Sequence, residues 1–232
     1  LIDRRKKLLN YVDKFITFSE FTKAEFLKSG LPDEKFVIKP NFFNDKKIEI
    51  KKSRQKNDAI YASRISEEKG INTLLSAWKS LDIKINIYGG GSILTDLIKK
   101  NSNNNKLVFH GSQNRQIVEE KLSNSKFLVF PSEWYETMGM TILEGFRSGT
   151  LVIASNLGVM RHIIKDKYNG ILFESGNYKD LQDKIRWVLD NPDRCDLITK
   201  NALSDFNNNF SEKPNYEQLI KIYTDVITNY NK

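Results

Sequence analysis

The sequence is poor in the residues that build disulfide frameworks and metal centres. Its 232 residues include one cysteine, Cys195, and two histidines, His110 and His162. A single cysteine excludes a disulfide within the chain and favours a reducing, cytoplasmic location. No Cys and His cluster has metal-ligand spacing, and no apolar run approaches the ~20 residues that span a bilayer. We therefore expect no metal, no disulfide and a cytoplasmic protein.

Acidic residues are fewer than basic ones, 29 against 37, which leaves a net charge of +8. Such an excess suggests an anionic partner, which can be nucleic acid, a membrane surface or a phosphorylated substrate. The strongest basic cluster, Arg4–Lys7, stands beside two leucines. It suggests peripheral contact with an anionic membrane, at its inner face, although such runs are more often solvated surfaces. Nothing in the sequence resembles a nucleic-acid motif, so we expect no nucleic acid partner.

Two carboxylates, Glu136 and Glu144, flank a predicted helix start. The apolar run Phe127–Phe130 predicts a buried strand that Pro131 ends, and helical spacing of apolar residues begins near Gly139. The first amides of a helix lack partners within it and bind phosphate oxygens, whereas carboxylates accept hydrogen bonds from sugar hydroxyls. A nucleotide-sugar suits this arrangement. The alternative is a chance pair, with one Glu capping the helix and the other solvated.

A second candidate site lies at the turn after another predicted strand, residues 59–63. This strand delivers Arg64 to its carboxyl end, and Lys69 follows on the far side of the turn. Ligands of open α/β sheets bind at that edge, so the two cations can clamp a diphosphate. The alternative is a surface ion pair between Arg64 and Glu67 or Glu68.

Two further strand ends carry glycine. Gly89 opens a run of three glycines, which allows a close approach of the backbone but lacks the spacing of a dinucleotide site. The strand Leu107–His110 leads into a turn that contains Gln113. We expect His110 itself to be a packed residue.

These motifs, taken together, closely resemble those of the GT-B glycosyltransferases of family 4, which are retaining nucleotide-sugar transferases. The segment from Pro131 to Ser155 matches the family's Glu-x-x-Gly-x-x-x-Leu-Glu signature, and Ser63–Gly70 matches its Gly-Arg-x-x-x-x-Lys-Gly motif. One loop departs from the pattern, because Gly158–His162 stands where Gly-Gly-x-Pro-Glu is usual. We assign His162 no role.

The resemblance implies a role for each site residue. Glu136 would lie against the donor sugar, and Glu144 would bind the ribose hydroxyls. Arg64 and Lys69 would bind the donor diphosphate and support catalysis, together with the backbone of Met138, Gly139 and Met140. The glycine turn at Gly89 would lie at the donor site, and Gln113 would lie near the nucleotide base.

The order of elements predicts an α/β fold, a Rossmann-like parallel sheet with helices on both faces, as in the C-terminal half of a GT-B enzyme. Strands are expected near residues 37, 60, 86, 108, 128, 152 and 172. We divide the chain into a terminal piece of an acceptor domain and hinge (1–35), a donor-binding domain (36–212) and a C-terminal helix that packs back toward the acceptor domain (213–232).

The predicted function is retaining transfer of a sugar from a UDP-sugar or GDP-sugar to a glycan, lipid-linked or protein acceptor, without cofactor or metal. The chain starts at Leu1, so we expect it to be a fragment that supplies the donor-binding half and is inactive alone. Alternatives are a subunit of a split glycosyltransferase that needs a partner chain, or a basic nucleic-acid-binding module. A sugar phosphorylase would need a pyridoxal-phosphate lysine that we cannot identify.

Overall fold

The computed structural model describes residues 9–43 and 57–230, and the chain divides into two compact units. The smaller unit is Leu1–Asp45 with Asn208–Lys232, and the larger is Lys46–Asn207. The basic cluster Arg4–Lys7 lies outside the described residues, so its membrane contact stays a prediction. Within the described ranges, no helix combines the length and the apolar character needed to cross a bilayer.

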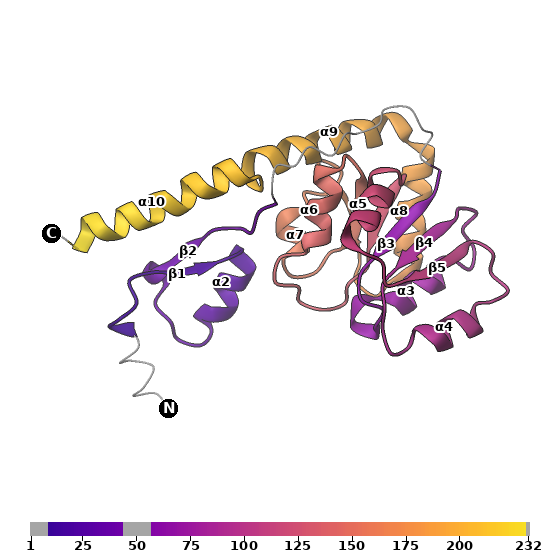
Figure 1. Cartoon of the computed structure of the whole chain (residues 1–232), viewed down its shortest axis with the longest axis horizontal. Coiled ribbons are helices and arrows are strands. Elements are labelled where there is room, and N and C mark those ends of the chain that lie inside the picture. Colours follow the sequence, from indigo (N-terminus) through magenta and orange to yellow (C-terminus); the bar gives the residue numbers. More distant parts are fainter. Residues whose placement is uncertain (1–8, 44–56, 231–232) are drawn as a thin grey trace. The chain divides into compact units, whose positions relative to one another are not determined.

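The larger unit is built on a six-stranded sheet in which every pair of neighbouring strands is parallel (Figure 1). Its spatial order is β5-β4-β3-β6-β7-β8. The strands are β3 (Ala59–Ala62), β4 (Ile85–Tyr88), β5 (Leu107–Gly111), β6 (Phe127–Phe130), β7 (Leu151–Ser155) and β8 (Ile171–Phe173). Together with the helices on its faces, this sheet confirms the predicted α/β fold class.

Helices alternate with these strands, as short crossovers between parallel strands require. They are the 3-10 turn η2 (Glu67–Lys69), α3 (Ile71–Ala77), α4 (Leu94–Lys100), α5 (Arg115–Ser123), α6 (Met140–Arg147), α7 (Met160–Ile163), α8 (Tyr178–Asp190) and α9 (Pro192–Asn209). The last of them reaches past the end of the unit.

Alternate strand residues bury opposite faces of the sheet, because side chains in a strand point to the two sides in turn. Tyr61 and Phe127 pack in one core cluster with α3 and α8. Ile60 and Leu128 are fully buried as well, and α5 and α6 pack together against the strands (Figure 1). The sheet is therefore covered on both sides, which explains its nearly continuous apolar strands.

The strand order places a switch point between β3 and β6. The chain proceeds from β3 to β4 and β5 on one side, then returns to lay β6 along the other side of β3. The loops after β3 and β6 consequently lead to opposite faces and leave a crevice at the carboxyl edge, where open α/β sheets bind ligands.

The smaller unit contains β1 (Phe15–Thr17), α2 (Glu20–Leu27), the 3-10 turn η1 (Asp33–Lys35), β2 (Phe36–Ile38) and α10 (Glu212–Tyr230). The two strands pair in parallel, with Phe15 opposite Phe36. Gln218 on α10 donates to the carbonyl of Ile38 at 2.8 Å. This corrects the predicted strand near residue 37, which pairs with β1 and not with the larger sheet. The division between units accordingly falls after Asp45, beyond the predicted boundary at residue 35.

Candidate functional site

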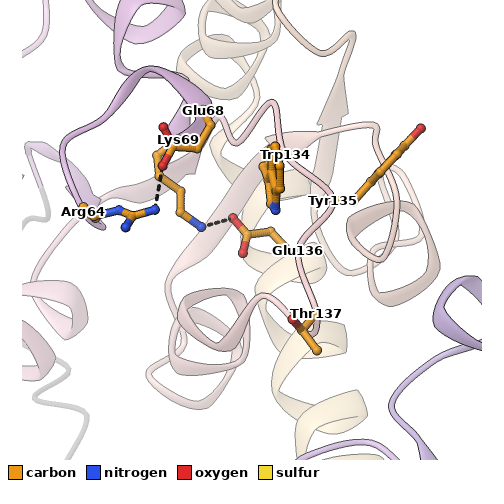
Figure 2. A pocket seen from close by; sticks show the side chains of 7 residues that line it. All are labelled: Arg64, Glu68, Lys69, Trp134, Tyr135, Glu136 and Thr137. Atoms are coloured by element: carbon orange, nitrogen blue, oxygen red, sulfur yellow. Dashed lines mark hydrogen bonds and ion pairs between the residues drawn. The ribbon is translucent and has the colours of Figure 1, made fainter.

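A pocket of about 540 Å³ lies at the switch point, between the loop after β3 and the loop after β6 (Figure 2). Its lining comes from both loops: Arg64, Glu68, Lys69, Trp134, Tyr135, Glu136 and Thr137. The structure therefore brings together the three residues that the sequence proposed as catalytic.

Glu136 is fixed by two contacts. Lys69 Nζ lies 2.5 Å from Glu136 Oε1, and the Ser132 hydroxyl donates to the same oxygen at 2.7 Å. The Lys69 and Glu136 side chains are only 18% and 14% exposed, so water screens this pair weakly. Figure 2 shows this ion pair between the Lys69 ammonium and the Glu136 carboxylate.

Arg64 forms a more open ion pair. Its Nη2 lies 2.6 Å from Glu68 Oε1, and the guanidinium side chain is 66% exposed. The Tyr61 hydroxyl donates to the carbonyl of Arg64 at 2.9 Å and anchors the backbone beneath it. The surface ion pair weighed from the sequence thus exists, and it forms part of the pocket wall.

The two loops are joined through their backbones. The amide of Glu133 donates to the carbonyl of Glu68 at 2.9 Å. Gly70 has a left-handed φ of +70°, and a Cβ added there would lie 1.8 Å from the carbonyl oxygen of Pro131. The Thr73 hydroxyl, on α3, donates to the Glu133 carboxylate at 2.6 Å. Lys69 and Glu136 therefore approach each other on a rigid frame that only glycine at position 70 permits.

The glycine turn after β4 packs against the segment that carries Arg64. Gly89 has φ +149°, and a Cβ added to it would lie 1.8 Å from the carbonyl oxygen of Ser63. The amide of Ile65 donates to the carbonyl of Gly90 at 2.8 Å. The glycines thus have a packing role in holding the Arg64 loop, and the donor contact expected at Gly89 stays a prediction.

Glu144 lies on α6, beyond the pocket lining, in a cluster with α5. Helix α6 starts after Gly139, and Glu144 Oε1 lies 3.6 Å from Arg115 Nη2. Burial raises the pKa of Glu144, while the positive charge of Arg115 opposes that rise. Arg115 also pairs with Glu119 at 2.8 Å. The carboxylate is thus shielded from water but faces a cation.

The predicted backbone contacts and the base contact lie along the same edge. Met138 and Gly139 are buried and Met140 is half-buried. Gln113 is exposed and donates to the carbonyl of His110 at 2.9 Å. His110 stacks on Tyr88, with ring centroids 4.3 Å apart. These positions test no ligand role, so each role stays a prediction.

The sequence reasoning missed several residues of the site. It assigned no helix to Arg115–Ser123, and so it did not see that Arg115 faces Glu144. Ser132 lies within the quoted motif, directly after the proline that ends a predicted strand. That position at the carboxyl end of a strand could have marked it as a site residue. Trp134 offered a signal as well, because a large aromatic beside a candidate carboxylate is typical of a binding surface.

The parallel sheet flanked by helices matches the fold of GT-B glycosyltransferase structures. The profile of the family described as "Glycosyl transferases group 1" matches residues 42–205, more than half of the chain. The chain belongs to that family.

Relatives and solved structures agree with this assignment. An uncharacterized glycosyltransferase of Methanocaldococcus jannaschii, MJ1178, is 27% identical over 223 residues, which cover 92% of this chain and 60% of that protein. A glycosyltransferase from Rickettsia africae superposes with a TM-score of 0.83 at 22% identity, covering 94% of this chain and 65% of its own. Anabaena HepE in complex with UDP and glucose superposes with a TM-score of 0.78 at 19% identity, covering 91% and 63%. The chain thus spans about 60% of the length of MJ1178.

Proposed function

We propose that this chain supplies the donor-binding half of a retaining glycosyltransferase that uses a nucleotide-diphosphate sugar. The observation that carries the proposal is the meeting of Arg64, Lys69 and Glu136 in one pocket at the switch point of the sheet. Two cations suit a diphosphate, and a carboxylate beside them suits sugar hydroxyls. Family membership supplies the reaction class.

The proposed catalytic term is electrostatic. Negative charge builds on the leaving diphosphate as the bond to the sugar breaks, and Arg64 and Lys69 would neutralise it from fixed positions. The amides at the start of α6, around Gly139, would add partial positive charge. Cations of the protein would then do what a divalent ion does in other transferases, so the proposed reaction is independent of metal.

Donor binding would involve an exchange of ion pairs. Lys69 already contacts Glu136, and Arg64 already contacts Glu68. A bound diphosphate would take over part of both cations, and Glu136 would then be released toward the hydroxyls of the donor sugar. Glu144 would accept hydrogen bonds from the ribose on the far side of the phosphates.

The donor class proposed is a UDP-sugar or a GDP-sugar, and the acceptor a glycan, a lipid-linked saccharide or a protein. Anabaena HepE, which shares the fold, is described in complex with UDP and with glucose. That likeness favours UDP as the first nucleotide to test. The length of the relatives supports the view that acceptor binding needs chain beyond these 232 residues.

Calorimetric titration of the chain with UDP, GDP and ADP tests the proposal. We expect one nucleotide to bind selectively and Arg64→Ala to weaken it by about 10- to 100-fold, the value of lost hydrogen bonds to a charged group. Arg186→Ala is the matched control, because it removes an arginine that pairs with Asp183 on α8, away from the pocket. Equal affinity of wild type and Arg64→Ala for every nucleotide would contradict the proposed site.

Retention and the need for a second half have their own test. Incubation of the chain with the selected nucleotide-sugar and candidate acceptors, followed by proton NMR of the anomeric signal, reports both the amount and the configuration of any product. We expect little or no turnover by this chain. Robust transfer would contradict the assignment of a donor-binding half. Inversion at the anomeric carbon in whatever small amount of product forms would contradict a retaining mechanism.

A further inference from the structure

Trp134 is the most exposed of the three tryptophans. Its side chain is 61% exposed on the pocket wall, whereas Trp78 is 1% exposed and donates its indole N–H to the carbonyl of Ile83. Trp187 is half-buried, with Lys167 Nζ 5.2 Å from its ring centroid. The exposed indole therefore lies at the candidate site, and the other two contribute to the packing of α3 and α8.

The backbone that leads into Trp134 is held by several hydrogen bonds. Its amide lies 3.4 Å from the Ser132 hydroxyl, and the preceding residue, Glu133, is bound to Glu68 through its amide and to Thr73 through its carboxylate. These contacts fix the backbone at the point where the exposed indole leaves it. Because this exposed aromatic ring lines a pocket that also holds charged groups, it is available to pack against a ligand bound there.

The chemistry around the ring narrows the kind of ligand. Trp134 is two residues from Glu136, and both side chains line the same pocket (Figure 2). A pyranose ring has one face of C–H groups, which packs on aromatic rings, and a rim of hydroxyls, which donate to carboxylates. A flat apolar face and a fixed carboxylate acceptor that line one pocket match those two features.

We propose that the indole of Trp134 is a stacking platform for a pyranose ring, with Glu136 receiving that sugar's hydroxyls. The proposal rests on the proposed function and deepens it, because it assigns a sugar-recognition residue outside the phosphate-binding pair. The ring can belong to the donor or to the acceptor, and the chemistry of contact is the same.

Titration with a bare nucleotide and with its sugar conjugate separates these cases. Tryptophan emission of the wild-type chain is expected to shift with UDP-glucose but not with UDP. Trp134→Phe should abolish the emission shift, because the two tryptophans that remain, Trp78 and Trp187, do not line the pocket. It should keep most of the affinity. Trp134→Ala should weaken UDP-glucose about ten-fold and leave UDP unchanged. The same pairs made with GDP-mannose and ADP-glucose cover the other bases.

The acceptor case has its own arm, in which maltose is titrated into the chain saturated with UDP. An emission shift that maltose causes and UDP-glucose does not, and that Trp134→Ala removes, would place the platform on the acceptor side. Tyr168→Ala is the control, because it removes an exposed ring on the loop between α7 and β8.

Three results would overturn the proposal. The first is an unchanged response of Trp134→Ala in both arms. The second is an equal loss for UDP and UDP-glucose, which would put the indole at the phosphate or base end. Either of these leaves the proposed function standing if Arg64→Ala still weakens UDP. The third is a wild-type chain that binds no nucleotide and no sugar, which would overturn the proposed function as well.

Discussion

The two ends of the candidate site differ in how closely their charged groups are paired. At the proposed phosphate end, each cation contacts a carboxylate directly, Lys69 with Glu136 at 2.5 Å and Arg64 with Glu68 at 2.6 Å. At the proposed nucleoside end, the carboxylate of Glu144 lies 3.6 Å from Arg115, and burial raises its pKa. One end is neutralised within the protein, and the other is only partly compensated.

This difference in charge pairing indicates how each end would bind its part of a ligand. A diphosphate competes with carboxylates for cations that are already engaged, so its binding depends on charge exchange. Ribose hydroxyls meet a carboxylate that burial disfavours in its ionised form, and each hydrogen bond they donate relieves part of that cost. We therefore expect the phosphate end to set affinity and the nucleoside end to set its pH dependence.

The largest effect should follow from Gly70→Ala, which removes the frame of the phosphate end. The new Cβ would meet the Pro131 carbonyl at 1.8 Å, so the loops after β3 and β6 must separate. We expect a loss of more than about 3 kcal/mol in the free energy of unfolding. Gly111→Ala is the matched control, with φ +65° and open space around the added atom, and should cost only about 1–2 kcal/mol. Similar losses in denaturant titrations of the two variants would contradict the frame.

Lys69→Met should separate the shielded ion pair from the open one. It leaves the Glu136 carboxylate, which is 14% exposed, without its cation, and we expect a loss of about 1.5–3 kcal/mol in unfolding free energy. Arg64→Met should cost less than about 1 kcal/mol, because its pair is solvated. Thermal unfolding compares the two variants. The double variant Lys69→Met with Glu136→Gln should recover stability without recovering nucleotide binding, and failure of that recovery would refute the argument from burial.

Glu144→Gln should change the pH dependence of nucleotide affinity. Burial holds the pKa of Glu144 above the ordinary 4.5. If this carboxylate accepts hydrogen bonds from the ribose as proposed, it is protonated and that contribution is lost as pH falls toward the raised value. The ratio of wild-type to variant affinity for the selected nucleotide, measured calorimetrically from about pH 8 to about pH 5, should therefore fall. Taking the ratio cancels titration of the diphosphate itself.

The pH dependence of folding stability has the opposite sign to that of nucleotide affinity. Because the folded-state pKa is raised, ionised Glu144 lowers stability as pH rises through the interval between 4.5 and the raised value. Glu144→Gln should accordingly be as stable as wild type or more stable near neutral pH. A constant affinity ratio, or a destabilised Gln variant, would show that Glu144 is a structural residue.

Arg115→Gln should have the smallest effect. Removing this positive charge lets the pKa of Glu144 rise further, so the fall in affinity should begin at higher pH, with a few-fold loss near neutrality. The arginine is largely exposed, which limits its contribution to less than about 1 kcal/mol. Arg186→Gln, on α8, should leave the pH profile unchanged. An Arg115→Gln profile that matches wild type would remove Arg115 from the site.

Sequence reasoning succeeded where local pattern and spacing determine structure. The strand Phe127–Phe130, the proline that ends it and the helix from Met140 follow from adjacent residues, and together they place Glu136 at the carboxyl edge. The sequence also offered an ion pair of Arg64 with Glu67 or Glu68, and the structure forms the one with Glu68. These features need no knowledge of the rest of the chain.

Long-range features were beyond its reach. Phe36–Ile38 is an apolar triplet that fits either sheet, and its pairing with Phe15–Thr17 depends on contacts that no local pattern encodes. Nothing in the order of residues shows that Lys69 selects Glu136, which is 67 positions away. The facing of Arg115 and Glu144 likewise depends on how α5 and α6 pack.

The strand order also implies the sequence in which the sheet and the pocket form during synthesis. β3, β4 and β5 pair in the order in which they are made, whereas β6 must later insert beside β3, on its other side. Arg64 meets its carboxylate four residues on, but Lys69 has to wait for Glu136, and such distant contacts form late. A growing chain that ends before residue 127 would therefore have both cations and no pocket. The binding of nucleotide would then report that β6 has paired with β3.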